Sequence, residues 1–188
     1  MPFYIDKSTA LLLDTRYVPS PNCDERPENE VPTLIVLHGI SLPAGEFGGP
    51  HIEHLFTNNL VITASPAFAE LADLKVSSHL LIRRDGEVIQ FVPFDRRAWH
   101  AGASNYQGRE RCNDFSIGIE LEGTDTTPYE AVQYERLAEV VACLLHTYPG
   151  LQRQHITGHS DIAPGRKTDP GPAFEWAKLS HVLDGILG

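Results

Sequence analysis

Sulfur is scarce in this chain, which has three cysteines and one methionine among 188 residues. Cys23, Cys112 and Cys143 form no paired framework and no CxxC motif, so a reducing compartment is the simpler interpretation. Long hydrophobic runs are also missing, since no segment approaches the ~18 apolar residues that cross a bilayer. Residues 1–20 lack the basic start and the apolar core of a signal peptide. We therefore expect a cytoplasmic protein.

Positive charge is the second shortage, because 15 Lys and Arg stand against 25 Asp and Glu, a formal net charge of -10. A nucleic-acid-binding domain normally carries a basic face, and an anionic membrane surface would not attract this chain. We expect neither nucleic acid nor membrane as a partner. The apolar fraction of 41% is ordinary for a globular protein. With no repeat or linker, residues 1–188 are predicted to form one domain. We also expect a monomer.

Apolar runs typical of buried strands occur at several places. Residues 33–38 are continuously apolar up to His38 and are predicted to form a central strand. Further strands are predicted over 77–84, 87–93 and 115–121, the first two joined by a two-residue hairpin turn at Asp85-Gly86. Residues 19–32 and 41–50 are rich in turn-forming residues and are predicted to be irregular.

Two helices are predicted in the C-terminal half. The first has Thr127 as its N-cap, Pro128 at its first position and Glu130 three residues after the cap, and it ends at 148–150. A last helix is predicted over 172–187. Strands interleaved with helices predict an α/β domain with a mostly buried sheet.

Histidine and aspartate supply a candidate metal site. His38 ends the first predicted strand, while His159 and Asp169 lie ten residues apart in the loop TGHSDIAPGRKTDPGPAFEW. Two imidazoles and a carboxylate are the three protein ligands that a catalytic zinc uses, with a fourth position left for water. The sequence therefore predicts one Zn²⁺ held by these residues.

Two further residues suggest hydrolytic chemistry at this metal. Glu120 lies near the end of the predicted strand 115–121, where a carboxylate is costly unless it is paired or functional. It is the candidate general base, taking a proton from water and passing it to a leaving nitrogen. Lys167, two residues before Asp169, is placed to stabilise a developing oxyanion.

Structural explanations remain open for each residue taken singly. Thr168-Asp169-Pro170-Gly171 alone is an ordinary turn, and Lys167 could be a solvated loop residue. His51 and His54, three residues apart, are a rival metal pair without a nearby third ligand.

Several other residues are candidates for contacts with a substrate. His79 within a strand could support a ligand from behind, whereas Trp99 and His100 suit a groove wall or the core. Cys112 is predicted to be structural. Lys75, Arg109, Arg111 and Arg166 are the cations nearest to the predicted site in sequence. Arginine suits carboxylates, although Arg111 could instead pair with a loop acid. The residues predicted to contact substrate are Trp99, Arg111, Lys75, Arg166 and His79.

Four long strings resemble the zinc-dependent N-acetylmuramoyl-L-alanine amidases: ISLPAGEFGGP, LIRRDGEVIQFVPFDRRAWHAG, YQGRERCNDFSIGIELEGTD and GHSDIAPGRKTDPGPAFEW. The resemblance is to the cytosolic branch that removes peptides from 1,6-anhydro-muropeptides in cell-wall recycling. It implies a mixed sheet flanked by helices, as in peptidoglycan-recognition proteins. It also implies zinc ligands at His38, His159 and Asp169 and a catalytic pair at Glu120 and Lys167. Gly39 departs from the family's usual Asn, which removes an amide expected at the substrate groove.

The resemblance implies hydrolysis of the amide between (1,6-anhydro-)N-acetylmuramic acid and L-alanine of a small muropeptide. Two alternatives stay open. A muropeptide-binding module without catalysis would have no need of a complete metal set with Glu120 and Lys167. A lytic amidase acting on polymeric peptidoglycan would be expected to carry an export signal or wall-binding repeats, and neither is visible in this sequence.

Overall fold

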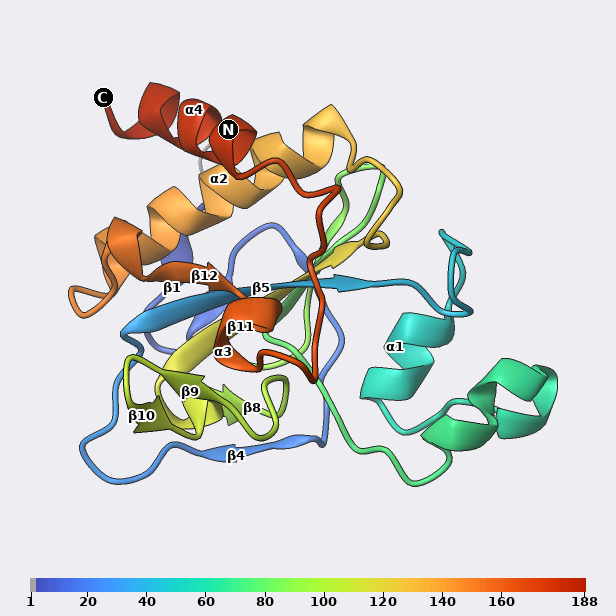
Figure 1. Cartoon of the computed structure of the whole chain (residues 1–188). Helices are drawn as coiled ribbons and strands as arrows, with labels where there is room; N and C mark the ends of the chain where they lie inside the picture. The colour runs from blue at the N-terminus through green and yellow to red at the C-terminus, as the bar shows by residue number, and fades with distance from the viewer. Residues whose placement is uncertain (1–2) are drawn as a thin grey trace.

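A mixed six-stranded sheet forms the centre of the computed structural model (Figure 1). The structure describes residues 3–188, so Met1 and Pro2 of the predicted domain lie outside the described residues. In the order β12-β5-β11-β6-β7-β3, only β6 and β7 pair antiparallel. The strands are β3 (Arg16–Tyr17), β5 (Leu34–Ile40), β6 (Leu80–Ile82), β7 (Val88–Gln90), β11 (Ser116–Glu122) and β12 (Ile156–Gly158). The predicted mixed α/β fold is confirmed.

Two long helices, α2 (Ala131–Thr147) and α4 (Trp176–Leu187), lie together on one face of the sheet, as Figure 1 shows above β5. Side chains alternate between the faces of a strand, so every second residue of β5 and β11 points toward these helices. Ile35, Leu37, Ile117, Ile119 and Leu121 are fully buried in this core. No helix within residues 3–188 combines the length and hydropathy needed to cross a membrane.

The opposite face of the sheet is covered less uniformly. Leu34 and Val36 of β5 pack there with Ile162, and Leu81 packs with the short helix α1 (His51–Phe56). By the same alternation, His38 of β5 and Ser116, Gly118 and Glu120 of β11 also face this side. The strands therefore bring polar side chains onto one face at the centre of the sheet.

Short elements flank both faces of the sheet. Antiparallel pairs are formed by β1 (Ile5–Asp6) with β2 (Leu11–Leu12), β4 (Cys23–Glu25) with β8 (Arg96–Ala98), and β9 (Asn105–Tyr106) with β10 (Arg109–Glu110). Of these, β1 and β2 lie on the side of α2. The remaining helix is α3 (His159–Ile162), and 3₁₀ turns occupy Ile62–Ala64, Pro66–Leu71, Cys112–Asp114 and Arg153–His155.

The start of α2 differs from the prediction. The helix begins at Ala131, and its capping box is formed by Glu130 and Gln133 rather than by Thr127 and Glu130. Gln133 is buried, and its amide also donates to the carbonyl oxygens of Ile82 and Glu122. This tertiary anchoring of Gln133 fixes the helix start three residues later than the local cap signal indicates.

Two loop predictions and the predicted start of the last helix are also corrected. Between β6 and β7 the turn is longer than two residues, because the Arg83 N–H donates to the Glu87 carbonyl at 2.9 Å. Gly86, at φ +87°, supplies the left-handed residue of a three-residue loop. The stretch 19–32 is not wholly irregular, since it contains β4. Likewise α4 begins only at Trp176, after Gly171 at φ +79°.

Candidate active site

Strand register places the site residues side by side. Glu120 of β11 is the direct parallel partner of His38 of β5. On the other side of β5, Gly158 of β12 pairs with Leu37, so His159 begins α3 immediately beyond His38. Asp169 follows in the loop after α3, which is tied back by a hydrogen bond from the Ser160 N–H to the Asp169 carbonyl at 2.9 Å.

Three potential ligand atoms converge at this point. His38 Nδ1 lies 3.0 Å from His159 Nδ1, and each nitrogen lies 3.1 Å from Oδ2 of Asp169. Lone pairs this close repel one another unless a proton or a cation lies between them. A tetrahedral zinc with bonds of about 2.0–2.2 Å has ligand atoms about 3.3–3.6 Å apart, close to these separations. The N, N, O donor set therefore fits zinc.

Neighbouring groups orient the two imidazoles. Nε2 of His159 lies 3.2 Å from the Ala101 carbonyl oxygen, which can only accept, so the proton sits on Nε2 and the Nδ1 lone pair faces the triangle. Nε2 of His38 contacts Nδ1 of His100 at 2.9 Å, and Nε2 of His100 contacts Ser116 Oγ at 3.1 Å. Burial lowers the pKa of His38 to about 4, so this imidazole is neutral near pH 7.

Glu120 carries the second notable feature of the site. It is 9% exposed, its Oε1 lies 4.0 Å from His38 Nδ1, and its Oε2 is buried without a hydrogen-bond partner among residues 3–188. Burial, followed by the charge of Asp169, raises the pKa of Glu120 well above its usual value. Such an unpartnered carboxylate costs stability, and a buried carboxylate with a raised pKa is typical of catalytic acids and bases.

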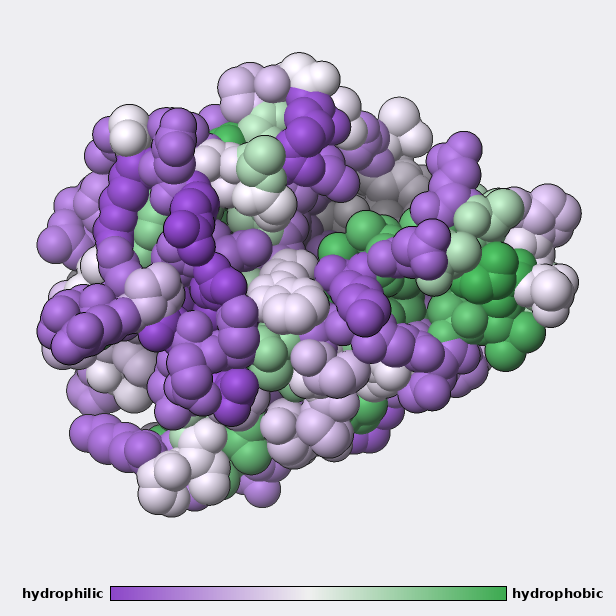
Figure 2. All heavy atoms as spheres, turned by 90° about the horizontal axis from the view of Figure 1, so that it is seen from below, coloured by the Kyte–Doolittle hydropathy of each residue, from purple (hydrophilic) through white to green (hydrophobic). Residues whose placement is uncertain are grey.

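A groove of about 450 Å³ opens beside these residues. Lys167 is exposed and lines it, and the charge of Lys167 acts against the raised pKa of Glu120. One wall is apolar and comes from the loop before α1, from α1 itself and from the segment that follows it; it includes Leu42, Leu55, Phe56, Leu71 and Val76. Figure 2 shows hydrophobic residues gathered on that side of the molecule, whereas most of the remaining surface is hydrophilic.

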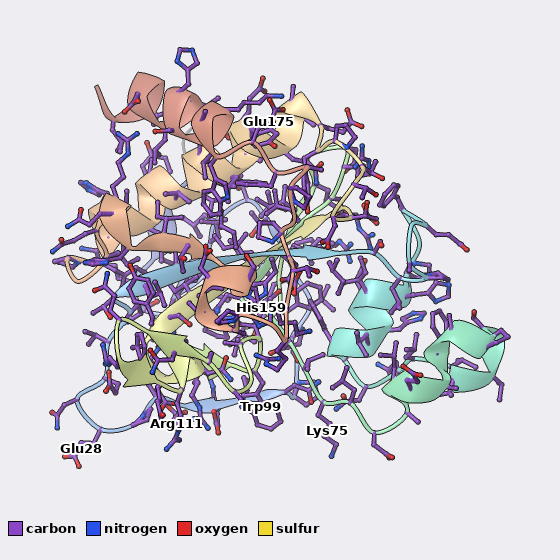
Figure 3. All side chains as sticks on the ribbon, viewed as in Figure 1. Glu28, Lys75, Trp99, Arg111, His159 and Glu175 are labelled. Atoms are coloured by element: carbon purple, nitrogen blue, oxygen red, sulfur yellow. The ribbon has the colours of Figure 1, made fainter. Side chains whose placement is uncertain are left out.

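The predicted substrate contacts occupy different places. Trp99, Lys75 and Arg166 line the groove, and Figure 3 shows Trp99 between Arg111 and Lys75 near the lower edge of the view. Arg166 Nη2 donates to the carbonyls of Ala101 and Ala103 at 2.6 and 2.7 Å. Arg111 lines an adjoining hollow that shares Arg166 with the groove.

His79 is the one predicted substrate residue whose placement does not fit a contact with substrate. It is 0% exposed and does not line the groove. Its Nδ1 accepts from the Gly118 N–H at 3.0 Å, and its Nε2 lies 3.0 Å from the Arg96 carbonyl. His79 therefore joins β11 to β8 behind the site. This placement matches the alternative expectation that His79 supports the site from behind.

The rival residues form no second site. His51 and His54 lie on α1, and the only group of three or more potential metal ligands within residues 3–188 is His38, His159 and Asp169. Cys112 is buried, and burial raises the pKa of its thiol, as expected for a structural cysteine.

Gly39 has a different role from the one inferred for the missing amide. A Cβ at this position would lie 2.3 Å from the Tyr129 hydroxyl and 3.4 Å from Pro170 Cα, so a side chain would point behind Asp169 rather than into the groove. Tyr129 fills that space and donates to the Pro170 carbonyl at 2.9 Å. Sequence reasoning missed Tyr129, whose only signal is its place just before a helix.

Fold and site together define the N-acetylmuramoyl-L-alanine amidase family. A sequence model of this family matches residues 28–172, and the chain belongs to it. The 1,6-anhydro-N-acetylmuramyl-L-alanine amidase AmpD of Enterobacter cloacae is 64% identical over 172 residues, which cover 92% of this chain and 91% of the relative. A crystal structure of a selenomethionine AmpD derivative matches with a TM-score of 0.92 and 57% identity, over 95% of this chain and 98% of that one.

A more distant structure shows a bound ligand. The amidase AmiD of Escherichia coli, in complex with the substrate anhydro-N-acetylmuramic acid-L-Ala-D-gamma-Glu-L-Lys, matches with a TM-score of 0.59 and 28% identity. The match covers 95% of this chain and 65% of that one.

Proposed function

We propose that this chain is a zinc-dependent amidase that hydrolyses the bond between (1,6-anhydro-)N-acetylmuramic acid and L-alanine of muropeptides. The observation that carries the proposal is the convergence of His38, His159 and Asp169 beside the unpartnered carboxylate of Glu120. The family and the substrate names of AmpD and AmiD support the choice of bond. We further propose a cytoplasmic, monomeric single domain over 1–188; the few unpaired cysteines and the lack of long apolar runs support the compartment.

His38, His159 and Asp169 are the residues that would hold zinc. When bound, zinc would supply an activated water and polarise the amide carbonyl. Glu120 takes the proton of the attacking water and transfers it to the leaving nitrogen of L-alanine. The Lys167 ammonium, on the open side of the groove, stabilises the negative charge that develops on the carbonyl oxygen. His100 and the Ala101 carbonyl hold the two imidazoles in the required orientation.

Substrate recognition is assigned to the groove walls. Trp99 and the apolar residues on the α1 side offer surface to the sugar and to small peptide side chains. The peptide of a muropeptide carries carboxylates, whereas the protein is acidic, so attraction must be local. Lys75, Arg166 and Arg111 are the cations placed along the groove and its adjoining hollow.

Product analysis tests this function. Zinc-loaded protein is incubated with an anhydromuramoyl-tripeptide and, side by side, with intact sacculi, and the products are identified by mass spectrometry. We expect free anhydro-N-acetylmuramic acid and free tripeptide from the first substrate. Release of peptides from sacculi alone would instead assign a lytic amidase, and tight binding without any cleavage would assign a binding module.

A further inference from the structure

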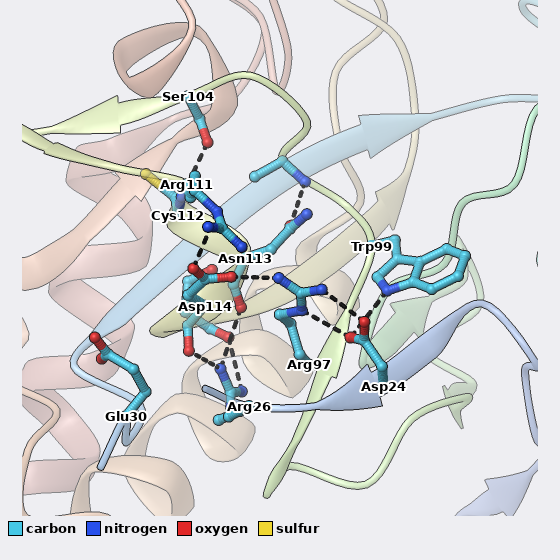
Figure 4. A network of polar contacts seen from close by, with 12 residues as sticks. Asp24, Arg26, Glu30, Arg97, Trp99, Ser104, Arg111, Cys112, Asn113 and Asp114 are labelled. Atoms are coloured by element: carbon cyan, nitrogen blue, oxygen red, sulfur yellow. Dashed lines mark hydrogen bonds and ion pairs between the residues drawn. The ribbon is translucent and has the colours of Figure 1, made fainter. Parts of the chain in front are cut away.

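The groove wall is connected to a chain of alternating charges, shown in Figure 4. Asp24 of β4 is the antiparallel partner of Arg97 of β8, and the Arg97 guanidinium binds it with two hydrogen bonds of 2.7 and 2.6 Å. The third nitrogen of Arg97 donates to Asp114 Oδ1 at 2.5 Å. Arg97 therefore bridges two carboxylates that are 90 residues apart in sequence (114 − 24).

Each of these carboxylates contacts a residue at the groove or at the hollow that adjoins it. Asp24 Oδ1 also accepts from the indole Nε1 of Trp99 at 3.1 Å. Asp114 Oδ2 lies 3.3 Å from Nε of Arg111. Trp99 lines the groove and Arg111 lines the hollow that adjoins it. The two ends of the chain of charges thus lie at the two places proposed to contact sugar and peptide.

The backbone at both ends is fixed as well. The Trp99 carbonyl accepts from the Ser77 N–H at 3.1 Å, and the Trp99 N–H donates to Ser77 Oγ at 3.2 Å. Arg111 has φ +61°, an uncommon conformation for arginine, and its N–H donates to the Ser104 carbonyl at 3.0 Å. With these backbones fixed, the direction of each side chain depends on the carboxylate that it contacts.

Charge distribution explains why Arg97 is needed between the two acids. Asp114 is only 12% exposed in its side chain, and without Arg97 its charge would be matched mainly by Arg111. Because Arg97 shares Asp114, the Arg111 guanidinium keeps uncompensated charge. Its contact with Asp114 runs through Nε at 3.3 Å, and its side chain is 71% exposed, so the terminal nitrogens are open to solvent. They remain available for a carboxylate, which arginine can bind with two parallel hydrogen bonds.

We infer that Asp24 and Arg97 are positioning residues for substrate binding, which hold the Trp99 indole and the Arg111 guanidinium in one fixed arrangement along the groove. The inference rests on the proposed function for the identity of the substrate. Fixing the two side chains before binding lowers the entropy cost of holding the ligand, so the effect is expected in KM rather than in kcat. An isolated surface ion pair would contribute little, but a bidentate pair within a network is the geometry that does contribute.

The test uses Asp24→Ala, with Asp184→Ala as a matched control. Asp184 lies on α4, away from the groove, and pairs with Arg153. Its side chain is 57% exposed, against 42% for that of Asp24. Both changes are made in a Trp176→Phe background, which leaves Trp99 as the only tryptophan of the two in the sequence. Zinc content, kcat, KM for the anhydromuramoyl-tripeptide and quenching of Trp99 fluorescence by acrylamide are measured for each variant.

We expect Asp24→Ala to raise KM about three- to tenfold, with zinc content and kcat near the background values and stronger quenching of Trp99. Asp24→Asn keeps an acceptor for the indole, so its quenching should resemble the background while its KM still rises. Asp184→Ala should change none of these readouts. In the double variant Asp24→Ala/Arg111→Ala, KM should rise less than the product of the two single effects, because both act on one arrangement.

Unchanged KM and unchanged quenching in Asp24→Ala would overturn the inference and make the pair a surface contact. Loss of zinc together with loss of kcat would also overturn it and assign these residues to folding. Multiplicative effects on KM in the double variant would show that Asp24 does not act on Arg111, which contradicts one shared arrangement. If the background protein cleaves no amide, the proposed function fails. Quenching then decides the inference alone, and equal quenching in Asp24→Ala and the background overturns it.

Discussion

Replacing Glu120 by glutamine tests the role of the buried carboxylate. The amide has nearly the same shape but cannot accept a proton from water. Glu120 lies 4.0 Å from His38 Nδ1 and is not one of the three potential ligands, so the substitution should leave zinc bound. We expect kcat to fall by about 10²–10⁴, or about 2.7–5.4 kcal/mol in activation free energy.

The same substitution should stabilise the metal-free protein. Burial raises the folded-state pKa of Glu120 above its ordinary value of 4.5, so ionisation of this residue costs stability as the pH rises beyond 4.5. Metal-free Glu120→Gln should therefore have a higher free energy of unfolding than the metal-free wild type at pH 7. The difference should shrink as the pH falls toward 4.5.

Three measurements decide the outcome: steady-state kinetics on the anhydromuramoyl-tripeptide, zinc content of the same samples, and urea unfolding at pH 7 and 4.5. A kcat within about threefold of the wild type would refute the assignment of Glu120 as the general base. If Glu120→Gln loses zinc while Asp169→Ala retains it, the ligand and the base have been interchanged.

Three further predictions follow from other parts of the structure. Arg111→Ala should raise KM for the tripeptide substrate with zinc content intact, and an unchanged KM would assign Arg111 to its loop pair with Asp114. Gly118→Ala should weaken zinc binding in a chelator competition. The new Cβ would lie 2.4 Å from the His100 ring and would displace it from its contact with His38. Wild-type affinity would show that His100 does not support His38. Glu53→Gln should lower the free energy of unfolding at pH 7. Hydrogen bonds from Arg16, and then from Arg83, lower the folded-state pKa of Glu53 from 4.5 to about 2. This shift corresponds to about 3 kcal/mol, which solvent screening reduces to about 1–2 kcal/mol. This stability is present above pH 4.5 and is lost as the pH falls toward 2, so urea curves of variant and wild type should converge there.

The sequence predicted the main strands and the grouping of His38, His159 and Asp169 because these signals are local. An apolar run ending in histidine specifies a buried strand end, and a loop rich in proline and glycine can bring His159 and Asp169 close together. The hydrophobic pattern of α2 was equally clear, although its first turn was not.

Features that depend on distant residues could not be predicted. β4 reads Cys-Asp-Glu and has no apolar alternation, so it forms a strand only because β8 lies beside it. The tautomer of His159 depends on the Ala101 carbonyl, 58 residues earlier. Likewise, burial of His79 follows from the meeting of three segments, which its local sequence does not show.

The measurement that tests the central claim most directly is a zinc titration of metal-free protein. Zinc is added in steps, and bound zinc and the rate of anhydromuramoyl-tripeptide cleavage are determined in the same samples, with His38→Ala, His159→Ala and Asp169→Ala measured in parallel. The rate should rise from near zero and level off at about one zinc per chain, and each variant should lose metal or activity. Full activity of the metal-free protein would contradict the account.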